Sequence, residues 1–231
     1  IRIGYGSDYV SQDDKQAIRN MDACERLGIP YGVYIYSYAL NMQDVESEIE
    51  HTLRMIQGRN PVRGVWFDME DADGYKARNG LDVYSEGELL SDFCEMFVNA
   101  MRVSGYKTGV YANYNYFTNV LDLDRLKSIP EMNIWLAHWE IDSPSLDCTM
   151  WQFGAVEIED EEYDGNIYYS DYSVKNDGNT DETIRTDDSS SNNINVYYQT
   201  KLSTGRWLPI VKNNADYAGI SGQSITGLAV T

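Results

Sequence analysis

Positive charge is scarce in this sequence. Its 231 residues include 18 lysines and arginines against 37 aspartates and glutamates, a formal net charge of −19 at pH 7. Binding to a phosphate backbone requires a basic face, so this charge balance argues against nucleic acid as a partner. Long apolar runs are missing too, since none approaches the roughly 20 residues of a membrane span. We therefore expect a globular protein whose partners include neither nucleic acid nor a membrane.

Cysteine is also scarce. Cys24, Cys94 and Cys148 form an odd, widely spaced set without a C-x-x-C pair, so neither a disulfide framework nor a zinc site is indicated. The length and a hydrophobic fraction of 42% suit one large domain, or one domain with a small appendage.

Segments with strand and helix patterns alternate from residue 1 to about residue 172. Apolar residues recur every three or four positions over 12–27, 41–58 and 85–105, which predicts three amphipathic helices. Repeated strand–helix–strand units favour a parallel sheet, either a barrel or a doubly wound sheet. Little helix separates the later strands, which argues against a regular eight-helix barrel. The predicted strands are residues 1–4, 31–39, 64–70, 107–113, 134–139 and 149–153.

Several polar residues have local structural interpretations. Asn41 is a predicted N-cap, and Ser85 with Glu88 forms a capping-box pattern before the third helix. His51 falls on a polar helix face, and the acidic run 157–164 predicts a solvated loop, with a calcium site as the alternative.

The character of the sequence changes at about residue 174. Residues 174–195 consist mainly of Asp, Asn, Ser and Thr, which predicts a linker. Residues 196–231 regain strand patterns and predict a small β-rich module, too short to hold a strong core alone. The expected domains are therefore a main domain over 1–173, the linker, and this module.

The segment most informative about chemistry is the predicted strand that runs into Asp68 and Glu70. In α/β folds and barrels, reactive residues collect at the carboxyl ends of strands. Side chains at i and i+2 share a face, and two carboxyls that close raise one another's pKa. A carboxyl still protonated near neutral pH is what a glycosidase needs to protonate a leaving oxygen. The alternatives at this stage are a divalent-metal site and a solvated strand end.

The aromatic residues favour a sugar-binding cleft. The chain has 19 Tyr and 5 Trp but only 5 Phe, so most of its rings carry a polar tip. Such rings stack on sugar faces and form hydrogen bonds to hydroxyl groups, although each could instead fill a core. The residues concerned lie at predicted strand ends: Tyr34, Tyr36, Tyr38, Tyr111, Asn113, Trp135 and Trp139.

Taken together, these segments resemble the Chalaropsis-type lysozymes, glycoside hydrolase family 25, which are common among phage endolysins and bacterial autolysins. The resemblance covers residues 1 to about 173, and it rests on the order and spacing of several short motifs. These motifs are IRIGYG at 1–6, GIPYGVY at 28–34, YSYA at 36–39, Asp68-x-Glu70, GVYAN at 109–113, WLA at 135–137, Trp151-Gln152 and Asp171.

The resemblance implies an irregular, flattened β/α barrel with few helices. It also implies hydrolysis of the β-1,4 bond between N-acetylmuramic acid and N-acetylglucosamine in peptidoglycan, without a cofactor or a metal ion. By resemblance Glu70 is the proton donor, Asp68 stabilises an intermediate formed with help from the substrate's acetamido group, and Asp171 is a further acid lining the cleft. The predicted sugar-binding residues are Tyr36, Tyr111, Asn113, Trp139 and Gln152.

One departure from the family pattern stands at the start of the chain. Family members open with a strand that ends in an Asp of the acidic cluster, whereas this sequence begins at what resembles the second strand. We expect the gene to encode that strand immediately before Ile1.

The resemblance places the protein outside the cell or in the cell wall, with residues 196–231 as a cell-wall-binding module. Two alternatives stay open, a non-catalytic peptidoglycan-binding protein and a metal-dependent hydrolase that uses the same acids.

Overall fold

The computed structural model describes residues 1–158, 161–169, 195–201 and 207–212. Nine strands form one sheet whose strand order follows the chain. Strands β1 to β6 pair in parallel and β6 to β9 pair antiparallel, so the sheet is mixed. The strands are β1 (Arg2–Tyr5), β2 (Val33–Tyr36), β3 (Val65–Asp68), β4 (Thr108–Asn113), β5 (Met132–Ala137), β6 (Met150–Ile158), β7 (Glu161–Tyr168), β8 (Asn195–Lys201) and β9 (Trp207–Lys212).

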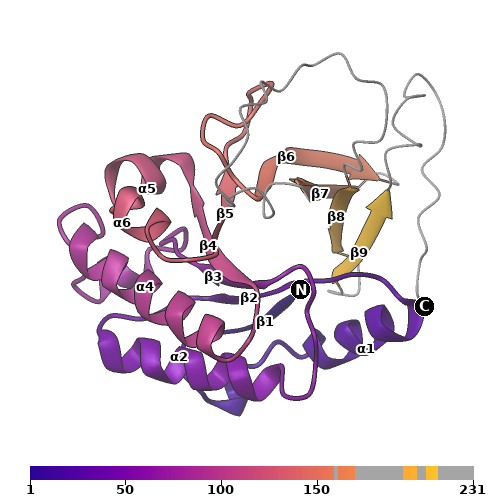
Figure 1. Ribbon diagram of the computed structural model, residues 1–231, viewed down its shortest axis with the longest axis horizontal. Coiled ribbons are helices and arrows are strands. Elements are labelled where there is room, and N and C mark those ends of the chain that lie inside the picture. Colours follow the sequence, from indigo (N-terminus) through magenta and orange to yellow (C-terminus); the bar gives the residue numbers. More distant parts are fainter. Residues whose placement is uncertain (159–160, 170–194, 202–206, 213–231) are drawn as a thin grey trace.

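Helices connect the first parallel strands and cover one face of the sheet (Figure 1). Helix α1 follows β1, α2 follows β2, and α3 and α4 follow β3, whereas the described segment between β5 and β6 holds no helix. The sheet curls into a half-barrel with few helices, consistent with the expected irregular barrel. The helices are α1 (Ala17–Leu27), α2 (Met42–Met55), α3 (Tyr75–Arg78), α4 (Gly87–Val103), α5 (Tyr114–Asn119) and α6 (Leu123–Lys127), with a 3₁₀ helix at Val10–Gln12.

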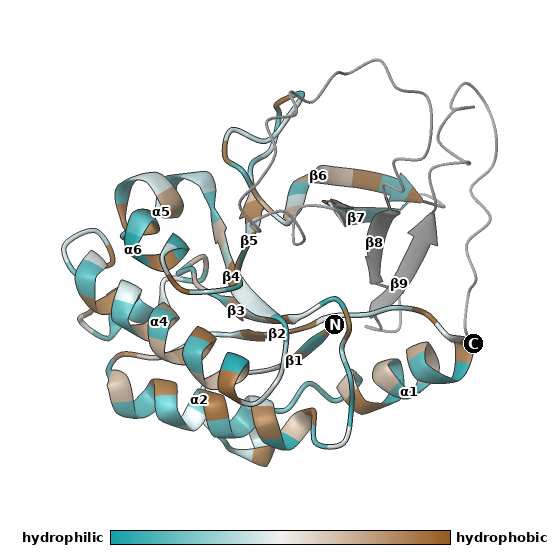
Figure 2. Ribbon diagram, viewed as in Figure 1, coloured by the Kyte–Doolittle hydropathy of each residue, from teal (hydrophilic) through white to brown (hydrophobic). Residues whose placement is uncertain are grey.

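The two faces of the sheet carry different side chains because neighbouring residues of a strand point to opposite sides. Alternate residues such as Ile35 and Phe67 join the core beneath the helices, where the rings of Phe67 and Phe97 stack at 4.4 Å. In Figure 2, α2 and α4 show alternating apolar and polar segments, as expected for amphipathic helices. The other face of the sheet carries Tyr34 and Trp66, whose rings both pack edge-on against the ring of Trp135.

Two helix starts were predicted, and one of them is confirmed. Asn41 caps α2, since its side chain accepts a hydrogen bond from the backbone N–H of Asp44 at 3.0 Å. The capping box before α4 is wrong, because the Ser85 hydroxyl donates instead to the Asp82 carbonyl at 3.2 Å. Helix α4 begins at Gly87. A Cβ at this position would lie 2.1 Å from the Val120 carbonyl oxygen, so only glycine lets the two backbone segments pack this closely.

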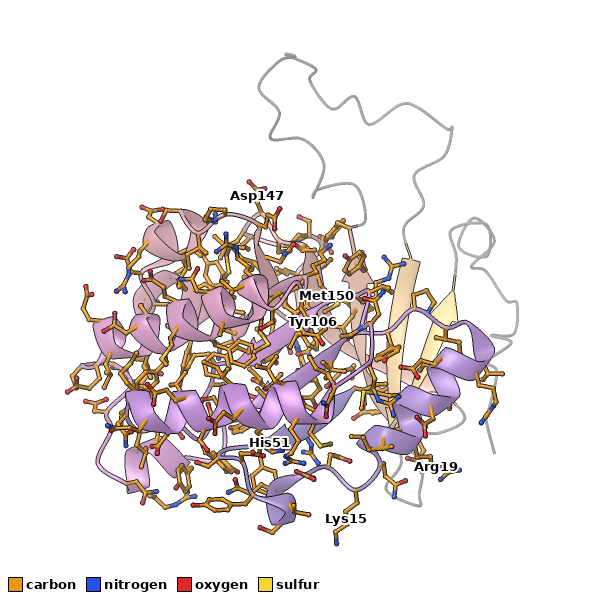
Figure 3. The ribbon with its side chains drawn as sticks, turned by 60° about the horizontal axis from the view of Figure 1, so that its bottom comes forward. Lys15, Arg19, His51, Tyr106, Asp147 and Met150 are labelled. Carbon is orange, nitrogen blue, oxygen red and sulfur yellow. The ribbon has the colours of Figure 1, made fainter. Side chains whose placement is uncertain are left out.

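Two further expectations are corrected. Instead of a solvated loop, the described part of the acidic run continues β6 to Ile158 and begins β7 at Glu161, with Tyr163 buried, Asp164 half-buried and the glutamates at 157, 161 and 162 exposed. His51 is fully buried rather than on an exposed polar face, with Nδ1 3.0 Å from the Gly6 carbonyl oxygen and Nε2 2.9 Å from a carboxylate oxygen of Asp13 (Figure 3).

The described part of the chain has no helix long and apolar enough to cross a membrane. Cys24, Cys94 and Cys148 are all buried free thiols, in agreement with the absence of a predicted disulfide framework. The predicted linker lies almost entirely outside the described residues. In the predicted C-terminal module the structure describes two strands, with β8 paired to β7 and β9 paired to β8.

Candidate active site

Asp68 lies at the carboxyl end of β3, and Glu70 follows two residues later. The parallel register places Asp68 between Tyr36 of β2 and Tyr111 of β4, and Tyr111 is paired in turn with Trp135 of β5. Asp68 is only 5% exposed, whereas Glu70 is half-buried. The sequence therefore brings one acid into a row of aromatic residues and sets the other at the edge of solvent.

Burial is the main cause of the altered acidity of this pair. It raises the pKa of Asp68 well above its ordinary value; the charge of Glu70 raises that pKa further, while Lys76 and Arg2 lower it. Burial also raises the pKa of Glu70, an effect opposed by Lys76. The predicted rise in acid pKa is thus present, but desolvation contributes more than like charge, and it acts most strongly on Asp68.

Two buried polar atoms, one in the acid pair and one beside it, have no hydrogen-bond partner among the described residues. They are Oδ1 of Asp68 and the hydroxyl oxygen of Tyr36. An unsatisfied buried polar group is costly, and such groups collect where a ligand or water completes the hydrogen bonding. Asp68 and Tyr36 therefore offer free polar atoms to a substrate at the carboxyl ends of β3 and β2.

A hollow of about 530 Å³ lies at the carboxyl ends of β4 and β5, with Gln152 of the neighbouring β6 in its wall. Gln152 of β6 organises one part of it, since its side-chain oxygen accepts hydrogen bonds from the Tyr111 hydroxyl and from Nε1 of Trp139, both at 3.1 Å. Trp139 is 47% exposed and presents its ring to solvent. The lining residues are Tyr111, Asn113, Tyr114, Asn115, Ala137, His138, Trp139 and Gln152.

Four of the five predicted sugar-binding residues line this hollow, and Tyr36 lies beside Asp68 instead. The side-chain oxygen of Asn113 is already used, because it caps α5 by accepting from the backbone N–H of Tyr116 at 2.9 Å. Asp171 lies outside the described residues.

Comparison of the sequence with known proteins identifies the family. The sequence model of Glycosyl hydrolases family 25 matches residues 5–162. The chain belongs to this family. A comparison with curated proteins found no match.

Solved structures of family relatives share the fold at low sequence identity. The CTP1L endolysin is 20% identical with a TM-score of 0.52, over 68% of this chain and 52% of that one. The modular autolysin LytC from Streptococcus pneumoniae, solved with a synthetic peptidoglycan ligand, is 24% identical with a TM-score of 0.56, over 68% of this chain and 36% of that one. GHIP, a glycosyl hydrolase 25 of Streptococcus pneumoniae, is 17% identical with a TM-score of 0.53, over 71% and 73%. The chain thus matches about half of the endolysin's length and about a third of the autolysin's.

Within this family fold, three residues at the site were not predicted from the sequence. Tyr114 and His138 stack at 4.3 Å in the wall of the hollow, and Asn166 of β7 accepts a hydrogen bond from Nε1 of Trp135 at 2.8 Å. His138 directly follows β5, which ends at Ala137, so the alternation of side chains along the strand does not apply to it.

Among the described residues, no group of three or more His, Cys, Asp or Glu side chains is arranged to hold a metal ion.

Two further residues missed by sequence reasoning, Glu48 of α2 and Lys76 of α3, are fully buried behind the acid pair. Glu48 accepts hydrogen bonds from the Ser37 hydroxyl at 2.9 Å and from the backbone N–H of Tyr38 at 2.7 Å. The sequence did contain a signal for the burial of Glu48, because this residue lies three positions after Val45 on the apolar stripe of its helix. Lys76 gave no comparable signal.

Glu48 makes the stability of the fold depend on pH. Burial raises the pKa of its carboxyl from 4.5 to about 7. The folded protein therefore holds this proton more tightly than the unfolded chain, and the resulting stabilisation is complete below pH 4.5 and lost as the pH rises through about 7. Glu48→Gln should reduce the difference in unfolding free energy between pH 5 and pH 8 by about 2 kcal/mol, measured by urea denaturation.

Glu50→Gln is the matched control, because Glu50 is exposed on the same helix. If Glu48→Gln and Glu50→Gln change the pH dependence equally, the stabilisation does not originate in the buried carboxyl.

Proposed function

We propose that this chain is the catalytic part of an N-acetylmuramidase, which hydrolyses the β-1,4 bond between N-acetylmuramic acid and N-acetylglucosamine in peptidoglycan. The observation that carries the proposal is the pair of a buried Asp68 and a half-buried Glu70, beside Tyr111 of the aromatic hollow. Membership of family 25 supports it, and so does the similarity to an autolysin solved with a synthetic peptidoglycan ligand.

In this proposal Glu70 donates a proton to the leaving glycosidic oxygen. It is the more exposed member of the pair and can therefore reach a sugar in the cleft. Burial makes both carboxyls hold protons more tightly than usual, and the charge of Glu70 also raises the pKa of Asp68, so the two groups titrate as a coupled pair. Positive charge that develops at the sugar favours ionised Asp68 and leaves the proton on Glu70.

Asp68 then stabilises the intermediate that forms with help from the substrate's acetamido group. Its free Oδ1 is available for this contact. The charge acts at short range in a partly dehydrated site, where electrostatic stabilisation is larger than in water.

Tyr36, Tyr111, Asn113, Trp139 and Gln152 are proposed to bind the sugars. Tyr36 lies beside the acids, and the other four lie along the hollow. This arrangement suits a glycan strand that runs across the carboxyl ends of β2 to β5 as far as Gln152 of β6, with its scissile bond at Glu70.

Trp139→Ala is expected to raise KM about tenfold, a loss of about 1.4 kcal/mol in stacking and hydrogen bonding, while kcat changes little. Steady-state kinetics on soluble peptidoglycan fragments measures this. Val103→Ala is the control, because Val103 is an 88% exposed apolar residue at the end of α4, outside the hollow. A fall in kcat with unchanged KM would contradict a binding role for Trp139.

Two parts of the proposal concern residues that the structure does not fully describe. Asp171 remains the proposed further acid of the cleft, by resemblance to the family. Residues 196–231 remain the proposed cell-wall-binding module, and the protein is proposed to act outside the cell or in the cell wall.

Release of reducing ends from purified peptidoglycan tests the proposed function, with and without a chelator. We expect release that the chelator leaves unchanged, since two-carboxylate hydrolysis requires no metal ion. Chelator-sensitive release would instead support a metal-dependent hydrolase. Sedimentation with peptidoglycan without release would support a non-catalytic binding protein.

A further inference from the structure

Lys76 is a fully buried cation directly behind the acid pair. Its ammonium group donates hydrogen bonds to two backbone carbonyls, that of Ser37 after β2 and that of Glu70 after β3, the latter at 2.8 Å. One side chain therefore connects the carboxyl ends of two adjacent parallel strands. It binds the peptide group of Glu70 itself.

The position of Lys76 is set by the loop that follows the acids. The two side-chain oxygens of Asp71 accept hydrogen bonds from the backbone N–H groups of Lys76 at 2.7 Å and of Ala77 at 3.1 Å. These contacts fix the start of α3 next to β3. The lysine stem is then directed back beneath the strand ends rather than into solvent.

A lysine without exposed surface is costly, because its ammonium group loses its hydration. An apolar residue of similar size would fill this space at lower cost, so packing alone does not explain a lysine at this position. Several elements direct charged or titratable groups at it: Glu48 from α2, Asp71 from the loop, Asp68 from β3 and Cys94 from α4. The centre of the Tyr36 ring from β2 lies 6.0 Å from the ammonium nitrogen. Lys76 is one of two cations that act on Asp68, together with Arg2.

We propose that Lys76 is a positioning residue for the acid pair: by joining the carbonyls of Ser37 and Glu70, its ammonium group holds the Glu70 carboxyl in reach of the glycosidic oxygen next to Asp68. The inference deepens the proposed function and rests on it. Catalytic groups displaced by about 1 Å can lose 10²-fold in rate, so a tether on the backbone of Glu70 matters to turnover.

The same ammonium group acts on the acids electrostatically. Its positive charge lowers the pKa of both Asp68 and Glu70, against the effect of burial. Without it, both carboxyls would hold their protons to higher pH. The charges of Asp164, Asp73 and Asp71 act in the opposite direction, and each raises the pKa of Glu70.

The competing explanation is that Lys76 only compensates the buried charge of Glu48. Both residues are fully buried, and each contacts Ser37. Under this explanation, a variant that removes both charges restores normal behaviour. Under the positioning role it does not, because the carbonyl of Glu70 still lacks its donor.

Lys76→Met, Glu48→Gln and the double variant separate these explanations, with Lys15→Met as an exposed control (Figure 3). We expect Lys76→Met to lower kcat about 10²-fold with little change in KM, and to move both limbs of the pH profile to higher pH. The double variant should regain stability against urea while its kcat and pH profile stay altered. Wild-type kcat and pH limbs in the double variant would overturn the positioning role.

Two additions keep this test decisive. Should Lys76→Met fail to fold, the double variant and Lys76→Gln carry the same comparison. Titration of the Glu70 and Asp68 carboxyl ¹³C signals by NMR should show a higher pKa in each Lys76 variant, independent of turnover. Unchanged titration overturns the inference even if peptidoglycan is cleaved. A wild-type protein that releases no reducing ends, with titrations shifted as expected, overturns the proposed function instead.

Discussion

Glu70→Gln is expected to lower kcat for peptidoglycan hydrolysis by a factor on the order of 10²–10⁴, with KM nearly unchanged. Glutamine has almost the shape of a protonated glutamate, so the cleft keeps its form while the transferable proton is lost. Because Glu70 is half-buried and its peptide group is held by Lys76, the amide should occupy the position of the carboxyl. Reducing-end release from purified peptidoglycan by the full-length protein measures the effect.

Glu50→Gln is the control for this change, as the same substitution at an exposed position of α2. It should leave kcat within error of the wild type. Near-normal activity in Glu70→Gln would contradict the assignment of Glu70 as the proton donor, and would favour the metal-dependent or binding-only interpretation of the acids.

The sequence was sufficient to locate the acids. A buried strand that runs into Asp68 and Glu70 has a strong local pattern, and the alternation of strands and helices favours parallel pairing of the strands. The aromatic row followed in the same way, since Tyr36, Tyr111 and Trp135 each fall on the same face of a strand as their partners in the register. These features depend on periodicity, which a single sequence displays.

The environment of the acids was not predictable in the same way. Lys76 lies in a short polar segment, and only the return of α3 beneath β2 and β3 buries it. Glu48 stands on the apolar stripe of α2, but its charge concealed that position. The capping box failed for a local reason instead, because the Ser85 hydroxyl donates to the Asp82 carbonyl and no side chain caps α4. Contacts between segments distant in sequence decided the burial of Lys76 and Glu48.

The acidic run 157–164 is a further case in which the local sequence pattern was misleading. Its charge density favoured a solvated loop, yet the backbone pairs Val156 with Tyr163 and Ala155 with Asp164. Asp164 is thereby brought near enough to raise the pKa of Glu70 and of Tyr111. A residue interpreted as part of a solvent-exposed run thus contributes to the electrostatics of the active site.

Asp68→Asn is expected to lower kcat on the order of 10²-fold, because the negative charge that stabilises the developing positive charge at the sugar is removed. Unlike Glu70→Gln, this change should alter the form of the pH profile. The limb at low pH, where activity rises as Asp68 ionises, should disappear. Loss of a like-charged neighbour should also lower the pKa of Glu70, so the limb at high pH, where Glu70 loses its proton, should move to lower pH.

Asp147→Asn, at an exposed position before β6, is the matched control and should keep both limbs. The pH profile of kcat on soluble peptidoglycan fragments measures the difference. If Asp68→Asn loses activity but keeps both limbs in place, Asp68 acts through the structure of the strand end rather than through its charge. If its low-pH limb disappears while the high-pH limb moves down, the two carboxyls titrate as one coupled pair, in which Asp68 must be ionised for Glu70 to deliver its proton.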